Sequence, residues 1–250
     1  MNGAPQRVLI VGGTSGIGKA VAKRMLQDGA QMVIAGRDPA RAAAAVKVLG
    51  RAVSAVTGDA GNPVQCAAMV TEAHARLGGI DCLISCAGGN PMPRLLADIP
   101  LDDLMGTINR SVAPTILPAR AVLPMMTAQG GGSIICVASD AAKIATPGEV
   151  AIGAAMAAIA MFCRAMAYEA KRQGIRVNCL TPSIVEGTAL HNRLMEDPFA
   201  ERLFSRAKAL AHLGVVQPED LAEIAAFLAS PGGARVTGQT ISVTGGISAI

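Results

Sequence analysis

A glycine-rich turn between a predicted strand and a predicted helix is the feature that most constrains how this chain can fold. The apolar segment 7–11 leads into Gly12-Gly13-Thr14-Ser15-Gly16-Ile17-Gly18, and a helical segment follows. Glycines there let the backbone turn tightly and approach a pyrophosphate, while the helix N-terminus offers free N–H groups and a positive dipole end. The position between a strand and a helix favours a dinucleotide-binding turn over a plain tight turn.

Short β-rich segments alternate with longer Ala-rich helical segments along the rest of the chain. Strands are expected at 7–11, 31–35, 52–57, 80–85, 133–137, 175–180 and 240–243. Helices are expected at 19–28, 39–49, 63–77, 101–126, 150–173 and 218–229, the fourth interrupted by Pro114 and Pro118. The alternation predicts a single α/β domain over residues 1–250. It is expected to be a Rossmann-type three-layer fold, with helices on both faces of a parallel sheet of about seven strands.

Composition argues against several other classes of protein. The net charge of +4 comes from scattered basic residues and only 2% of residues are aromatic, so nucleic-acid binding is not expected. The six cysteines form no CxxC pair, so no metal site is expected. The longest apolar stretch, 150–163, has 14 residues, whereas a membrane helix needs about 20. With no secretory signal in view, we expect a cytoplasmic protein that binds no membrane.

Residues after the second and third strands bear on the cofactor. Arg37 follows the second strand, where an arginine accommodates the 2′-phosphate of NADP, so NADP(H) is favoured over NAD(H). The alternative is a solvated arginine beside Asp38. Asp59, followed by Ala60, comes after the third strand, where an adenine ring would rest. A simple turn aspartate is equally compatible with that position.

Several further motifs can be read together with the glycine turn. They are Asp59, Cys86-Ala87-Gly88, Asn109, Ser139, Ile175-Arg176-Val177-Asn178 with Pro182, Thr237-Gly238-Gln239 and Val243-Thr244-Gly245-Gly246. Together these motifs resemble the short-chain dehydrogenase/reductase family in its compact form, over essentially the whole chain. Cys86 stands where the family has an asparagine, Ser183 where it usually has a glycine, and Thr244 where an aspartate is common.

The resemblance implies a fold, a cofactor and a reaction. Hydride would pass between a nicotinamide and the carbonyl or alcohol carbon of a small-molecule substrate. Asn109 and Ser139 would be catalytic, and residues 183–212 would form a substrate lid. The cofactor would be held by Gly12, Thr14, Ser15, Gly16, Ile17, Gly18, Arg37, Asp59, Ala60, Ala87, Gly88, Pro182 and Ile184.

Two of the family's four catalytic positions carry other residues in this chain. The Tyr-x-x-x-Lys pair falls on Ile152 and Met156, which can neither transfer a proton nor carry a charge. The only tyrosine, Tyr168, lies about 24 Å further along the same predicted helix, at 1.5 Å per residue. We therefore expect Tyr168 at a helix end or a subunit contact, and a site that lacks the usual proton donor.

The intact cofactor motifs and the missing pair leave three functions open. The first is an atypical NADP(H)-dependent oxidoreductase, in which Ser139 and Asn109 orient the carbonyl. Its proton would come from water, from the substrate, or from Lys143, Glu149 or His191, although each of these is more often a solvated side chain. Ser139 and Asn109 are equally compatible with local backbone bonding.

The second function is a catalytically inactive partner subunit in a mixed oligomer with a related chain, for example in a hydroxyacyl-thioester dehydrogenase. The third is a non-catalytic NADP-binding module. Outside the mixed assembly, a homo-oligomer (dimer or tetramer) is expected.

Overall fold

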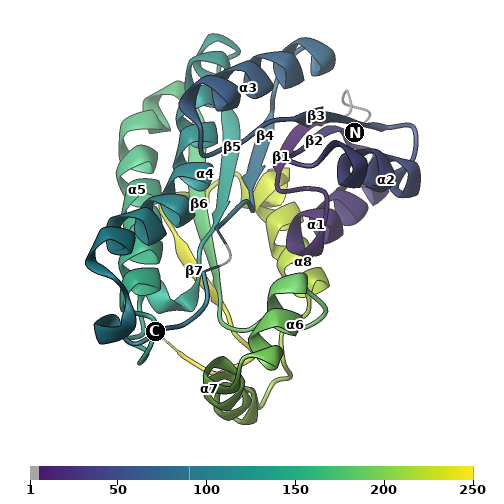
Figure 1. Cartoon of the computed structure of the whole chain (residues 1–250). Helices are drawn as coiled ribbons and strands as arrows, with labels where there is room; N and C mark the ends of the chain where they lie inside the picture. The colour runs from purple at the N-terminus through teal and green to yellow at the C-terminus, as the bar shows by residue number, and fades with distance from the viewer. Residues whose placement is uncertain (1–5, 90, 250) are drawn as a thin grey trace.

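The computed structural model describes residues 6–89 and 91–249, and its centre is one sheet of seven parallel strands (Figure 1). The strands are β1 (Arg7–Val11), β2 (Gln31–Gly36), β3 (Val53–Thr57), β4 (Cys82–Ser85), β5 (Gly132–Val137), β6 (Ile175–Pro182) and β7 (Thr240–Val243). They lie in the order β3-β2-β1-β4-β5-β6-β7, and every neighbouring pair is parallel. The predicted Rossmann-type α/β fold is confirmed.

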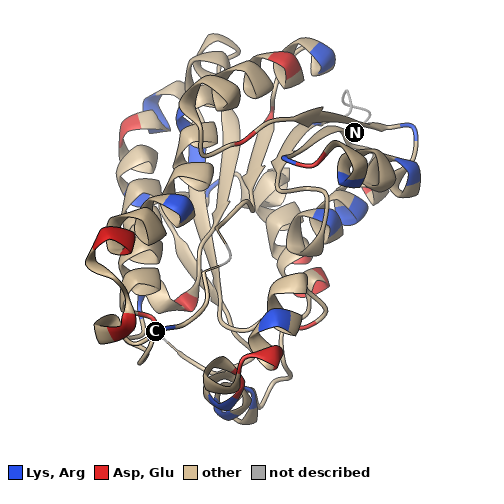
Figure 2. Cartoon of the chain, in the orientation of Figure 1, with Lys and Arg blue, Asp and Glu red and all other residues tan. Residues whose placement is uncertain are grey.

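Helices cover both faces of this sheet. They are α1 (Gly16–Gln27), α2 (Pro39–Leu49), α3 (Pro63–Leu77), α4 (Leu101–Ala128), α5 (Val150–Ala170), α6 (Ala189–Glu196), α7 (Pro198–Ala209) and α8 (Pro218–Ala229). One face packs against α1, α2 and α8, and the other against α3, α4 and α5. Lys and Arg are interspersed with Asp and Glu over the helices seen in Figure 2.

Strand β1 shows why the sheet needs a helical layer on each side. Leu9 and Val11 join the core formed with α3, α4 and α5, whereas Val8 and Ile10 join the core formed with α1 and α8. Successive side chains of a strand point to opposite faces, so an apolar segment without alternation must be buried on both. All four side chains are at most 1% exposed.

The prolines of α4 do not interrupt it, contrary to the expectation from the sequence. The helix continues from Leu101 to Ala128 with Pro114, Pro118 and Pro124 inside it. Pro118 has no N–H to donate to the carbonyl four residues earlier. The hydroxyl of Ser85 in β4 donates to that Pro114 oxygen instead, at 3.3 Å. A side chain of the sheet thus supplies a hydrogen bond that the proline removes.

Other differences from the expected elements are local. Helix α1 begins at Gly16 rather than at 19, and β4 begins at Cys82 rather than at 80. The segment 183–212 contains α6 and α7, which the sequence pattern did not indicate. These two helices lie below the sheet in Figure 1.

One helical segment is apolar enough to span a membrane by length and composition alone. This segment, Val150–Gln173, has 24 residues and a mean hydropathy of 1.9 in its most apolar window. Half of that window is buried within the fold, and Ile159 and Cys163 pack against the sheet. Its apolar character is therefore accounted for by its place in the core.

Candidate dinucleotide and substrate site

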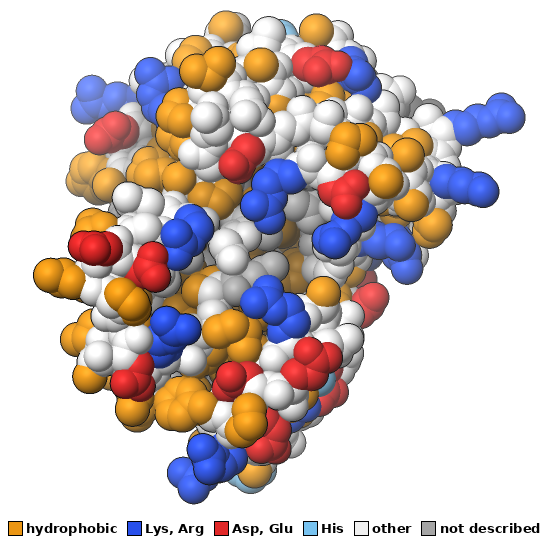
Figure 3. All heavy atoms as spheres, in the orientation of Figure 1, with side chains coloured by type: hydrophobic (Ala, Val, Ile, Leu, Met, Phe, Trp, Pro, Cys, Tyr) orange, Lys and Arg blue, Asp and Glu red, His pale blue; other side chains and the backbone are white. Residues whose placement is uncertain are grey.

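The carboxyl end of the sheet borders one large cavity of about 1200 Å³, which opens in the hollow near the centre of Figure 3. The glycine-rich turn, the ends of β2, β3, β4 and β5, the start of α5 and the helices α6 and α7 all line it. Every residue that the family resemblance assigns to the cofactor or to catalysis lies on its wall. Their placement agrees with the predicted roles, and the roles themselves stay predictions.

The glycine-rich turn is shaped by close backbone contacts that exclude side chains. Gly12 has φ +84°, and its N–H donates to the carbonyl of Ala35 at 2.9 Å. A Cβ on Gly18 would lie 2.3 Å from the carbonyl oxygen of Gly12. The turn therefore folds back on itself, and α1 starts directly at the cavity wall.

The N-terminus of α1 is suited to an anionic ligand. The side chain of Ser15, which precedes α1, makes no capping hydrogen bond to the helix. By contrast, Asp38 and Asn62 cap α2 and α3 with their own side-chain oxygens. The first N–H groups of a helix need an acceptor, and those of α1 face the cavity without one from Ser15. The fit between this turn and a pyrophosphate is therefore good.

Two arginines lie on the cavity wall where β2 ends. Asp38 accepts from the N–H groups of Ala40 and Arg41, at 2.9 and 3.1 Å, and so serves the first turn of α2. The Nε atom of Arg41 lies 3.3 Å from Oδ2 of Asp38. Among the described residues, Arg37 forms no ion pair. Sequence reasoning missed Arg41, although its position four residues after Arg37 in the first turn of α2 could have suggested it.

Asp59 and Ala60 border the same end of the cavity. The carboxylate of Asp59 accepts from the N–H of Gly61 at 2.9 Å, which is the local turn contact considered as the alternative. The backbone N–H of Asp59 donates to the side chain of Gln65 at 2.9 Å. One carboxylate oxygen is thus used within the turn, which fixes the side chain at the cavity edge.

The segment after β4 is tied to α4. The hydroxyl of Thr115 donates to the carbonyl of Ala87 at 3.0 Å. Cys86, which replaces the family's asparagine, borders the cavity with Ala87 and Gly88. Burial raises the pKa of the Cys86 thiol to about 12, so Cys86 stays a neutral thiol at ordinary pH.

Ser139 and Asn109 both line the cavity, one after β5 and the other on α4. Ser139 follows β5, and its Oγ accepts from the N–H of Ala141 at 3.3 Å. This is the local backbone bond weighed as the alternative for Ser139, and the hydroxyl hydrogen is still available to a ligand. Asn109 is an exposed residue of α4. The site therefore offers a hydroxyl and an amide, but neither is an acid or a base at neutral pH.

The part of the cavity wall that α5 contributes is apolar at Ile152 and Met156. Ile152 and Met156 lie on the cavity side of α5 and are 7% and 9% exposed. Tyr168 lies near the other end of α5, is 76% exposed, and has Lys171 Nζ 3.7 Å from its ring centroid. It is not part of the cavity wall, so the tyrosine does not replace the missing proton donor.

The far end of the cavity is lined by α6, α7 and the C-terminal segment. Their apolar side chains there are Ile184, Leu190, Leu194, Leu203, Phe204 and Ile247. His191 also lines the cavity. Its buried Nε2 lies 4.0 Å from Glu186 Oε1 and has no hydrogen-bond partner among the described residues. Lys208 lies 2.6 Å from the same oxygen, and its hydrogen bond lowers the pKa of Glu186.

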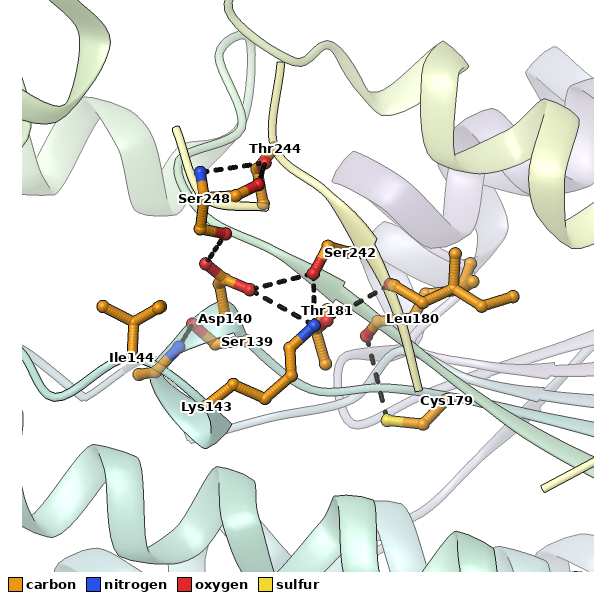
Figure 4. A network of polar contacts seen from close by, with 12 residues as sticks. Ser139, Asp140, Lys143, Ile144, Cys179, Leu180, Thr181, Ser242, Thr244 and Ser248 are labelled. Carbon is orange, nitrogen blue, oxygen red and sulfur yellow. Dashed lines mark hydrogen bonds and ion pairs between the residues drawn. The ribbon is translucent and has the colours of Figure 1, made fainter. Parts of the chain in front are cut away.

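Lys143 is held by a network of polar contacts close to Ser139 (Figure 4). Asp140 is 4% exposed, lies 3.5 Å from Lys143 Nζ, and accepts from the hydroxyls of Ser242 (3.3 Å) and Ser248. Lys143 also donates to Ser242. Sequence reasoning missed Asp140, because nothing in the local pattern distinguishes it from a surface turn residue. Lys143 is therefore held in this network by Asp140 and Ser242, and it is not itself among the residues that line the cavity.

Comparisons with known proteins agree with this geometry. A family model described as enoyl-(acyl carrier protein) reductase matches residues 11–248. Dehydrogenase/reductase SDR family member 4 of Bos taurus is 33% identical over 241 residues, which cover 95% of this chain and 85% of that protein.

Solved structures with the same fold include complexes with either nicotinamide cofactor. A gluconate 5-dehydrogenase from Burkholderia cenocepacia with NADP and tartrate is 30% identical, with a TM-score of 0.86 and coverage of 97% and 94% of the two chains. A 3-ketoacyl-(acyl-carrier-protein) reductase from Brucella melitensis with NADH is 28% identical, with a TM-score of 0.86 and 98% of each chain covered. A short-chain oxidoreductase from Pseudomonas aeruginosa, described as containing an atypical catalytic centre, is 29% identical, with a TM-score of 0.87 and 97% coverage of each.

Proposed function

This chain belongs to the short-chain dehydrogenase/reductase family, and on that premise we propose that it is an NADP(H)-dependent oxidoreductase whose site works without a Tyr/Lys pair. The observation that carries the proposal is the continuity of the cavity. One space runs from the uncapped N-terminus of α1 past Ser139 to the apolar side chains of α6 and α7. A dinucleotide and a small substrate would both fit into it and meet beside Ser139.

The choice of NADP(H) rests on Arg37 and Arg41. Both arginines border the cavity beside the end of β2, where the 2′-position of the adenosine ribose is recognised in this type of fold. Asp38, the acidic residue that could bind a 2′-hydroxyl, caps α2 instead. The two arginines can bind a 2′-phosphate, and the Asp38 carboxylate is not free to accept from a 2′-hydroxyl. This arrangement favours NADP(H) over NAD(H). When bound, the nicotinamide supplies or accepts a hydride.

The residues beside the nicotinamide end would orient the substrate. The Ser139 hydroxyl would donate to the carbonyl oxygen, because its oxygen already accepts from Ala141. Asn109, which also lines the cavity, would add an amide donor or support the wall. Ile152 and Met156 exclude water without transferring a proton. The apolar end formed by α6 and α7 favours a substrate whose carbonyl is attached to an apolar chain or ring.

A single-turnover assay tests this proposal. The protein is saturated with NADPH or NADH and mixed with a panel of ketones and acyl thioesters with apolar substituents. We expect NADPH oxidation with part of the panel, and calorimetry should show tighter binding of NADP⁺ than of NAD⁺. Absence of oxidation with either cofactor across the panel would count decisively against an active enzyme.

The apolar pair Ile152–Met156 also favours a second candidate, an inactive partner subunit of a mixed oligomer. This candidate predicts that a related chain is recovered with the protein from its native source, and recovery of a homo-oligomer alone would exclude it. A third candidate, an NADP-binding module, predicts micromolar or tighter NADP binding without turnover. Calorimetry without detectable NADP binding would exclude that module.

A further inference from the structure

Glu149 lies at the start of α5, about one helical turn before Ile152. Residues three apart at the surface of a helix are neighbours, with about 5–6 Å between their Cβ atoms. Glu149 and Ile152 line the same cavity as Ser139. The start of α5 also packs against the 3-10 turn Asp140–Ala142 that directly follows Ser139. A carboxyl group is therefore placed beside the position at which the family has its phenol.

The backbone around Glu149 is fixed on both sides. Its N–H donates to the carbonyl of Thr146 at 3.0 Å, and its carbonyl accepts from Gly153 at 2.6 Å. Gly148 before it has φ +82°, and a Cβ there would lie 2.5 Å from the ring of Phe199 in α7. The carbonyl of Gly148 accepts from the N–H of Arg94 at 2.7 Å. The residue is thus clamped between α7, the segment after β4 and α5.

The carboxyl of Glu149 makes few interactions with the rest of the described chain. It makes no capping hydrogen bond to α5, although it stands at the capping position. No residue in the described part of the chain forms an ion pair with it. Burial raises the pKa of Glu149 to about 7, against the opposing effect of a hydrogen bond with Thr146. A carboxylic acid that titrates near neutrality can both donate and accept a proton.

Of the charged and titratable groups on the surrounding elements, Arg110 and His191 border the cavity, and the others are engaged elsewhere or exposed. Asp140 and Lys143, in the turn under α5, are bound to each other and to Ser242. On the segment after β4 and on α4, Arg94 and Arg110 are exposed. On the lid side, His191 in α6 also borders the cavity. Glu201 and Arg202 lie near the start of α7, and the Glu201 carboxylate accepts from the hydroxyl of Ser205 at 2.9 Å.

We propose that Glu149 exchanges the proton with the substrate oxygen in this cavity, the role that Ile152 cannot perform. This inference rests on the oxidoreductase activity proposed above. In reduction, the carbonyl carbon takes the hydride that the cofactor supplies, and the C=O π pair moves onto the oxygen. That oxygen takes the proton from the Glu149 carboxyl, so an alcohol forms and a carboxylate remains. Solvent returns a proton to Glu149, and oxidation runs through the same steps in reverse.

The other two ionisable candidates are less well placed. Lys143 points into the buried network with Asp140 and Ser242. His191 is carried by α6, across the cavity from α5, and its Nε2 faces Glu186 at 4.0 Å. Glu149 alone of the three directly precedes the helix that carries Ile152, three residues before it.

The first test measures titration in the protein without cofactor. Glutamate side chains labelled with ¹³C at the carboxyl carbon are followed by NMR across the pH range. We expect one resonance to titrate near pH 7, to be missing in Glu149→Gln, and to persist in Glu169→Gln. Glu169 is an exposed residue of the same helix outside the cavity, so it provides a matched control. A Glu149 resonance that titrates at an ordinary carboxyl pKa would overturn the assignment.

The second test measures single-turnover reduction across pH. We expect the wild-type rate to fall as pH rises through about 7, because the acid form donates. Glu149→Gln should lower the rate at least about 10²-fold and remove the pH dependence, while NADP⁺ affinity stays within about twofold. Glu149→Asp should retain part of the rate, and Glu169→Gln all of it.

The outcomes separate the two proposals. A wild-type protein that turns over while Glu149→Gln keeps its rate and pH profile overturns the role of Glu149 alone. A wild-type protein that oxidises no cofactor with any substrate at any pH overturns the oxidoreductase proposal, and this inference with it.

Discussion

Lys143 Nζ lies 3.5 Å from Asp140 Oδ1, and this buried ion pair belongs to the turn that follows Ser139. The two side chains are 14% and 6% exposed, so solvent screens them little. The same aspartate also accepts from Ser242 and Ser248, which ties the C-terminal segment to the floor of the cavity. The pair therefore affects both folding and the shape of the site.

Lys143→Met is expected to lower the free energy of unfolding by about 3 kcal/mol, because removal of one partner leaves the other charge buried without its counter-ion. Urea denaturation measures the change. The double variant Asp140→Leu with Lys143→Met should recover much of the loss, since neither charge then remains. A cost of less than about 1 kcal/mol for Lys143→Met, typical of exposed pairs, would contradict a buried role.

Arg37→Ala is expected to weaken NADP⁺ binding roughly 10- to 100-fold, which corresponds to about 1.5–3 kcal/mol for a charged hydrogen bond. NAD⁺ has no 2′-phosphate, so its affinity should change little. Arg41→Ala should act in the same direction. Calorimetry with both nucleotides checks this, and exposed Arg51, outside the cavity, provides the matched control. Equal losses for both nucleotides would refute the assignment to the 2′-phosphate.

Ser85→Ala is expected to cost about 1–3 kcal/mol of stability, because the buried carbonyl of Pro114 then loses the donor seen at 3.3 Å. Pro118→Ala restores a backbone N–H at the position that normally donates to this carbonyl. In a Pro118→Ala background, Ser85→Ala should therefore cost measurably less. Thermal or urea unfolding of the wild type, the two single variants and the double variant measures the coupling energy between Ser85 and Pro118. Strictly additive losses of stability would argue against this hydrogen bond as the replacement.

Glu149→Gln is expected to stabilise the protein at alkaline pH. The pKa of Glu149 is raised from 4.5 to about 7 by burial, so the folded state holds this proton more tightly than the unfolded state. The contribution favours folding below pH 4.5 and is lost as pH rises to about 7. By 1.36 kcal/mol per pKa unit, the variant should gain up to about 3 kcal/mol at pH 8 and little near pH 5. Unfolding midpoints measured across this range, with Glu169→Gln as control, decide the point.

The part of the structure that could be predicted from the sequence is the part set by local requirements. The strand–glycine–helix order of 7–27 and the apolar segments of β1 and β6 specify the parallel sheet and the cofactor turn. Ser139, Asn109 and the Ile152–Met156 pair could be placed because each follows a recognisable element at a fixed distance.

The features that could not be predicted depend on contacts between segments far apart in the chain. Ser85 donates a hydrogen bond to Pro114 in α4, 29 positions further along the chain. Ser248 donates one to Asp140 across a separation of 108 residues. Helices α6 and α7 bury only a few side chains, such as Leu194 and Phe204, in a small cluster apart from the sheet, and their overall apolar content is low. The carboxyl of Glu149 gains its properties from burial, which a single sequence does not show.

Ile152→Tyr together with Met156→Lys connects the missing pair to Glu149. A phenol has a pKa near 10, and a neighbouring ammonium lowers it, so the double variant regains a proton donor on the cavity wall. We expect its single-turnover rate to rise about 10²-fold or more. Because the phenol then donates the proton, Glu149→Gln should cost less than about threefold in this background, against about 10²-fold in the wild type. The variant Ile152→Phe with Met156→Lys has the ring without the hydroxyl and should remain dependent on Glu149. A loss of equal size in every background would mean that Glu149 supports the architecture of the site rather than proton transfer.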